Sequence, residues 1–146
     1  MLEKSNEYVS NTPNYFLNRA YCDVILGDIE NAKKMINLCK QKNTKNLSWK
    51  YSEAFLAAYE NKSTSRIVTL YRSALKVPYD IQDLIIYIET TLEREYKIGL
   101  LLAVAILYDE IGNGELAKEY FEKYIIAQED QEKTRDLFRR KGFVID

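Results

Sequence analysis

Apolar side chains recur along this chain at spacings of three and four residues, the spacing of one face of an α-helix. The first run begins after Thr12-Pro13, an N-cap followed by a proline in the first turn, and continues to Gly27. Further runs follow, without the alternation typical of β-strands. The pattern predicts an all-α protein of about eight helices, over residues 13–26, 28–40, 47–61, 63–77, 81–94, 96–111, 115–127 and 130–141.

The predicted helices are joined by short polar segments, which force consecutive helices to lie antiparallel. Asp28 and Asp80 are candidate N-caps, residues 63–65 offer caps for the fourth helix, and Pro78 ends that helix. The length predicts a single domain, residues 1–146. Within it, residues 1–12 are expected to form a flexible or loosely docked N-terminus and residues 130–146 a capping helix with a tail.

Two stretches, 14–40 and 98–124, follow one plan. In each, an apolar helix with a small residue in its middle ends at a glycine. An alanine follows five residues after that glycine, and a large apolar residue follows four residues later. These positions are Ala20, Gly27, Ala32 and Ile36 in the first stretch, and Ala105, Gly112, Ala117 and Phe121 in the second. Small residues allow two helices to approach closely, and the large residue fills the space between them.

This plan resembles the tetratricopeptide repeat (TPR), a pair of antiparallel helices of about 34 residues. The later copy matches the family's pattern at Leu101, Ala105, Tyr108, Ala117 and Phe121, with Tyr124 where a second alanine is usual. The earlier copy has Asp23 where tyrosine is usual. A weaker middle copy fits at Tyr51, Ala54, Ala58, Tyr71, Ala74 and Pro78. The resemblance implies a right-handed superhelix of helix hairpins with a concave groove.

The distance between the two clear copies indicates one additional helix. Gly112 follows Gly27 by 85 residues, whereas two repeats span about 68. The surplus corresponds to one helix with its turn, and the predicted helix at 81–94 is the natural candidate. An extra helix breaks the alternation of the hairpins, so the superhelix should be interrupted or bent there.

Residues Gly112 to Ala117 also fit G-x-G-x-x-A, the pattern of a dinucleotide-binding loop. Such a loop follows a β-strand and precedes a second strand with an acidic residue about 20 positions on. Here the preceding run keeps helical spacing back to Tyr96, and a charged helix follows Ala127. The corresponding corner at Gly27 lacks the second glycine. We therefore predict a corner between two helices and no nucleotide cofactor.

The composition excludes several kinds of chemistry. The 146 residues include no histidine, which removes Ser-His-Asp and Cys-His catalysis, the usual zinc sites and Glu-x-x-His di-iron sites. Cys22 and Cys39 are far apart in the sequence and form no C-x-x-C motif, so we expect them to be buried thiols of an intracellular protein. A net charge of −1 provides no basic field for nucleic acid. The longest apolar run, 98–108, is too short for a bilayer, and no signal peptide is visible, so we expect a cytoplasmic protein.

The resemblance implies that the first helix of each hairpin lines the groove, which would be largely apolar and suited to a peptide or helix with hydrophobic anchors. The residues in this register are Leu17, Tyr21, Val24, Trp49, Ser52, Leu56, Tyr59, Leu102, Ile106 and Asp109. They do not reproduce the Lys and Asn residues with which the family's chaperone-tail binders grip a carboxylate. A second interpretation remains open, in which the chain's own fifth or eighth helix fills the groove.

The C-terminal segment is basic. One interpretation is a solvated capping helix whose cations favour its C-terminal end. The alternative is a contact with an acidic partner or nucleic acid through Arg135, Arg139, Arg140 and Lys141. The last apolar residues, Phe143, Val144 and Ile145, form a hook that either folds back or docks on another subunit.

These observations favour a non-catalytic module that binds another protein or a peptide, with no metal, cofactor, nucleic acid or membrane. The alternative is the sensor and dimerisation part of a peptide-responsive transcription regulator, or a partner of one, because TPR-like domains occur there. In that case a homodimer is expected.

Overall fold

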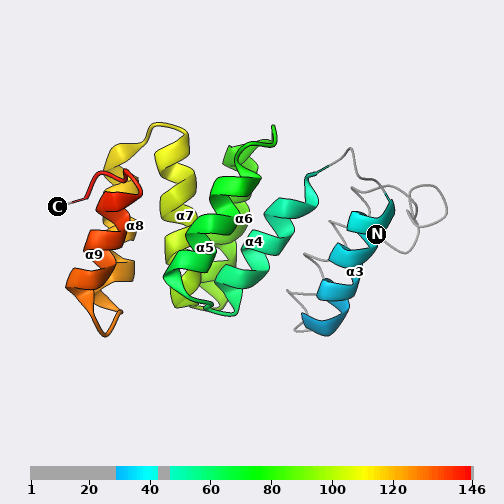
Figure 1. The fold of residues 1–146 in the computed structure, drawn as a ribbon, viewed down its shortest axis with the longest axis horizontal. Coiled ribbons are helices and arrows are strands. Elements are labelled where there is room, and N and C mark those ends of the chain that lie inside the picture. The colour runs from blue at the N-terminus through cyan, green and yellow to red at the C-terminus, as the bar shows by residue number, and fades with distance from the viewer. Residues whose placement is uncertain (1–28, 43–46, 146) are drawn as a thin grey trace.

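Figure 1 shows the computed structural model, which describes residues 29–42 and 47–145. Every regular element in these two stretches is an α-helix, which confirms the all-α prediction for this part of the chain. The predicted helix at 13–26 lies outside the described residues. The helices are α3 (Ile29–Lys42), α4 (Trp49–Tyr59), α5 (Thr64–Ala74), α6 (Ile81–Arg94), α7 (Ile98–Glu110), α8 (Gly114–Ile126) and α9 (Gln131–Arg140).

Side chains at the loop–helix junctions explain where several helices begin. The hydroxyl of Ser63 and the carboxylates of Asp80 and Asp130 each accept a hydrogen bond from the backbone N–H three residues further on, at 3.3, 3.2 and 3.0 Å. These N–H groups have no partner within the helix, so the caps stabilise its first turn. The predicted caps at Ser63 and Asp80 are confirmed, and the predicted cap at Asp28 lies outside the described residues.

The Gly112 motif is a corner between α7 and α8. Gly112 has φ of 83°, a left-handed conformation that glycine adopts readily. The N–H of Asn113 donates to the carbonyl of Tyr108 at 3.0 Å, and the N–H of Gly112 donates to that of Asp109 at 3.1 Å, which together form a Schellman motif. The side chain of Asn113 then caps α8 through the N–H of Leu116. A helix precedes the motif, so the predicted corner is confirmed and the dinucleotide loop is excluded.

Helix α7 lies in the interior of the stack and contacts α4, α5, α6 and α8 (Figure 1). Every residue from Gly99 to Tyr108 is buried, so this helix has no polar face along most of its length. Gly99 lies directly against α4, where a Cβ atom added to it would be 2.0 Å from the carbonyl oxygen of Ala58. The two backbones approach this closely because neither side chain is larger than a methyl group.

The predicted helix at 81–94 is confirmed as α6, and it packs against α7. The ring of Tyr87 lies 5.2 Å from that of Phe55 on α4. The carboxylate of Glu89 accepts hydrogen bonds from the hydroxyls of Tyr108 on α7 and Tyr120 on α8, at 2.9 and 3.0 Å. Helix α6 therefore covers apolar side chains of α4 and α7 with the chain's own residues.

The C-terminal hook folds back onto the chain. Gly142 ends α9 in the same left-handed conformation as Gly112, with φ of 86°. Phe143 is only 5% exposed, and its ring lies 4.8 Å from Phe121 and 6.0 Å from Phe138. Val144 remains exposed. Of the two interpretations of the hook, the structure shows the folded-back one for Phe143.

Candidate functional site

The structure places the predicted groove residues in different environments. Three of them lie outside the described residues: Leu17, Tyr21 and Val24. Leu102 and Ile106 are 0% and 1% exposed, and Ser52 and Leu56 are also buried. The prediction of an open groove is therefore wrong for Ser52 and Leu102, whereas Leu56 and Ile106 are buried but each border a pocket.

The buried groove residues and their neighbours in the sequence face different helices. Leu56 and Ile106 each border a pocket together with residues of α5, whereas their neighbours Phe55 and Leu107 pack with α6. Adjacent residues of an α-helix differ by about 100° in direction. A change of one residue along α4 or α7 therefore moves from the face beside α5 to the face covered by α6.

The remaining predicted groove residues keep some exposure: Trp49, Tyr59 and Asp109. The hydroxyl of Tyr59 donates to Glu95 at 2.7 Å, and the ammonium of Lys97 lies 4.7 Å from the centre of its ring. The hydrogen bonds from Tyr59 and Lys97 lower the pKa of Glu95. Burial, followed by the bond to Glu95, raises the pKa of the Tyr59 phenol. Tyr59 thus holds the α6–α7 connection against α4.

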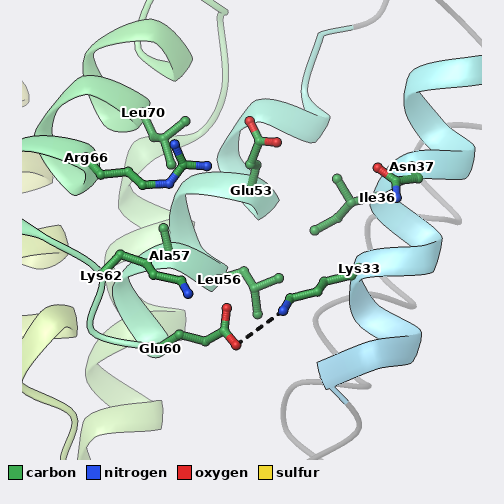
Figure 2. Close-up of a pocket in the computed structure, with 10 residues that line it drawn as sticks. All are labelled: Lys33, Ile36, Asn37, Glu53, Leu56, Ala57, Glu60, Lys62, Arg66 and Leu70. Atoms are coloured by element: carbon green, nitrogen blue, oxygen red, sulfur yellow. Dashed lines mark ion pairs between the residues drawn. The ribbon is translucent and has the colours of Figure 1, made fainter.

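A trough of about 320 Å³ opens between α3 on one side and α4 and α5 on the other (Figure 2). Its apolar lining comes from Ile36, Leu56, Ala57 and Leu70. Figure 2 shows Ile36 and Leu56 directed toward the gap from opposite sides. These side chains lie at the base of the trough, where they can contact an apolar group of a ligand.

Two acidic residues of the trough are already neutralised by lysines of α3. The ammonium of Lys33 lies 3.4 Å from the carboxylate of Glu60, as the dashed line in Figure 2 marks. Lys40 donates a hydrogen bond to Glu53 at 2.7 Å. The two pairs connect α3 to α4 at two points along the trough.

The α5 side of the trough is positively charged. Lys62, just before α5, and Arg66, in its first turn, are exposed and border the trough. Neither of them forms an ion pair with a residue in the described part of the chain. The first turn of α5 contains no acidic residue that would balance them. The arrangement can therefore hold an apolar group at its base and an anionic group at its α5 rim.

Trp49 is connected to the trough through Lys40. The ammonium of Lys40 is 4.7 Å from the centre of its indole ring, and the same lysine binds Glu53, which borders the trough. Because Trp49 is the single tryptophan of the chain, its fluorescence reports on the α3–α4 end of the molecule.

Two of the basic C-terminal residues form ion pairs within the chain. Arg135 binds Glu122 of α8 through two hydrogen bonds, one of them 2.9 Å long, and Arg139 pairs within α9. Arg140 and Lys141 are exposed. The bonds from Arg135 lower the pKa of Glu122. These contacts support the capping-helix interpretation, and a contact between this segment and an acidic partner remains a prediction.

The described residues contain no group of three or more His, Cys, Asp or Glu side chains placed to hold a metal ion. Cys39 is buried, and burial raises the pKa of its thiol, which disfavours the reactive thiolate. Cys22 lies outside the described residues. None of the described helices has the length and apolar character needed to cross a membrane.

Of the residues that line the trough, the sequence placed only Leu56 on a binding face, because only the first helix of each hairpin was considered. Ile36 was assigned to the core, and it is indeed only 5% exposed. Lys62 and Arg66 were the available signal, since two cations at the start of a helix without an acidic residue in its first turn oppose the helix dipole.

Comparison with known proteins adds no assignment: no family model, no curated protein and no solved structure matches this chain.

Proposed function

We propose that this chain is a TPR-like, non-catalytic module that binds a peptide segment of a partner protein. The observation that carries the proposal is the trough between α3 and α4–α5, which combines an apolar base with a charged rim. Its volume of about 320 Å³ falls in the range of about 300–1,000 Å³ that is usual for ligand sites. The absence of histidine from the sequence supports binding over acid–base or nucleophilic chemistry.

Helix α6 closes the other face of α4 and α7, on which Phe55 and Leu107 lie, to a ligand. Tyr87 and Glu89 of α6 pack on α4, α7 and α8, so a ligand on that face would first have to displace a helix of the same chain. None of the described residues has to be displaced for a ligand to reach the trough.

A selection from random 12-residue peptides displayed on phage tests the proposal. The full chain is the bait, and enriched peptides are synthesised and measured by calorimetry. The variant Asn37→Trp places a bulky side chain in the trough at an exposed position, and Gln82→Trp makes a similar surface change on α6. We expect peptides that bind the wild type and Gln82→Trp but not Asn37→Trp.

Two outcomes would contradict the proposal. Selection without enrichment would remove the evidence for peptide binding altogether. Enriched peptides that bind Asn37→Trp as tightly as the wild type would locate the binding surface outside the trough.

A further inference from the structure

The charges around the trough are distributed unequally. Glu53 and Glu60 each have a lysine partner, at 2.7 and 3.4 Å, whereas Lys62 and Arg66 have no ion-pair partner among the described residues. Within the described part of the chain, the trough therefore presents two cations without an ion-pair partner, whereas both of these carboxylates are neutralised. This imbalance defines the chemistry of the ligand.

We infer that the trough recognises an acidic peptide segment of a partner protein: an aliphatic side chain enters between Ile36 and Leu56, and an adjacent Asp or Glu carboxylate binds Lys62 and Arg66. This inference rests on the proposed function and specifies its ligand. The apolar base contributes affinity by removing apolar surface from water. The two cations favour an acidic residue next to the aliphatic residue of the peptide.

The N-terminal end of α5 adds to the positive potential of the Lys62 and Arg66 side chains. Arg66 lies in the first turn of this helix, where the helix dipole contributes partial positive charge. The hydroxyl of Ser63 already accepts the hydrogen bond of the Arg66 N–H, so the ligand carboxylate is bound by side chains and not by this N–H group. The dipole therefore adds to the positive potential without providing the contact.

A basic peptide is disfavoured by the same contacts. To bind a Lys or Arg side chain, Glu53 or Glu60 would have to exchange the lysine that it now binds. The incoming cation would also lie close to Lys62 and Arg66. Specificity thus comes from repulsion of the wrong ligand as well as attraction of the right one.

The phage selection described above is repeated with the double variant Lys62→Gln/Arg66→Gln as bait. The control bait is Lys76→Gln/Arg94→Gln, which removes the same charge from exposed positions outside the trough and outside the basic C-terminal segment. We expect wild type and control to enrich an aliphatic residue next to Asp or Glu, and the trough variant to lose the preference for the acidic residue.

The enriched peptide is then synthesised with its acidic residues and with Gln in their place. An exposed ion pair contributes a factor of about 2–5, so loss of both cations should weaken binding of the acidic form roughly 4- to 25-fold. Binding of the Gln form should barely change between the baits. Affinity for the acidic form should also fall as salt rises, because exposed charges are screened.

Each contrary outcome is informative. The selection could instead enrich basic or uncharged peptides that bind the wild type but not Asn37→Trp. This result would overturn the acidic specificity but would leave the trough as a peptide site. If selection yields no peptide at all, the proposed function fails together with this inference. A dimer in light scattering that dissociates in Lys62→Gln/Arg66→Gln would assign the trough to a second copy of the chain, and would overturn the inference.

Discussion

At the scale of single residues, two glycines are required for different reasons. Gly99 is required for space, because the carbonyl oxygen of Ala58 occupies the place that a Cβ would need. Gly112 has nothing within 4 Å of that place but has φ of 83°, so it is required for its backbone conformation. Gly114 has open space, and its φ lies outside the left-handed region, so it provides a control for both.

The substitution Gly99→Ala should destabilise the protein by about 3 kcal/mol or more, because the Cβ would overlap backbone that cannot move without separating α4 from α7. Urea unfolding followed by circular dichroism measures the change. Gly114→Ala should stay within about 1 kcal/mol of the wild type, in the stabilising direction. Equal stability of the two variants would show that the α4–α7 contact is looser than described.

The substitution Gly112→Ala should cost less, about 1–2 kcal/mol, which is the penalty of a left-handed conformation for a residue with a Cβ. The same urea experiment measures it, and the protein should keep its helix content. A loss as large as that of Gly99→Ala would argue against this interpretation, since no neighbouring atom obstructs the Cβ at Gly112.

At the scale of elements, individual polar contacts hold whole helices in place. Glu89 connects α6 to tyrosines of α7 and α8, and burial followed by the bond to Glu89 raises the pKa of Tyr108 to about 12. Glu122 and Arg135 connect α8 to α9 in a similar way. Because each contact joins two helices, its loss should affect one helix more than the rest of the molecule.

The substitution Glu89→Ala should loosen α6 selectively. Two tyrosine hydroxyls would lose a charged acceptor, at a cost of about 1–3 kcal/mol. Hydrogen exchange should become faster in the amides of α6 than in those of α8. The control is Glu93→Ala, at an exposed position of the same helix. It should change the free energy of opening measured by hydrogen exchange by less than about 0.5 kcal/mol. A uniform acceleration in all helices would contradict a local role for Glu89.

The pair Glu122–Arg135 should make stability depend on pH. The folded-state pKa of Glu122 is lowered by the bonds from Arg135, below its ordinary value of 4.5. Its contribution is therefore fully present above pH 4.5 and is lost as the pH falls through the folded pKa. Glu122→Gln should be less stable than the wild type at pH 7, and this difference should shrink in acid.

Thermal unfolding at several pH values measures that difference. Glu119→Gln is the control, because Glu119 and Lys123 form an exposed pair on the same helix and such pairs contribute little. A difference between Glu122→Gln and wild type that stays constant from pH 7 to strong acid would show that the charge of Glu122 is not what holds α9.

At the scale of the whole molecule, the buried side chains form one contiguous cluster that extends from Ala32 on α3 to Phe143 after α9. A shared core makes unfolding cooperative, although repeat proteins can lose this cooperativity along their length. We expect Trp49 fluorescence, which reports on the α3–α4 end, and far-ultraviolet circular dichroism to show the same urea midpoint. An earlier transition of the fluorescence would show that this end unfolds separately.

The candidate site could be predicted less well than the helices. Lys62 and Arg66 are visible in the sequence as unbalanced charge at a helix start, but their position opposite Ile36 depends on how α3 packs on α4. The groove expected around Leu102 and Ile106 failed for the same kind of reason, because helices distant along the chain bury both side chains. Residues 102 and 106 are apolar in either arrangement, so their pattern cannot distinguish a groove from a core.

The sequence by itself determined the described helices, with ends that differ by a few residues, and the corner at Gly112, because apolar periodicity, capping side chains and a left-handed glycine act over a few neighbouring residues. It also indicated the helix now seen as α6. The tertiary structure alone decided which faces of α4 and α7 are covered and where a trough stays open. Those outcomes depend on the rotation of each helix against partners far along the chain, and a difference of one residue, about 100°, exchanges a covered face for another.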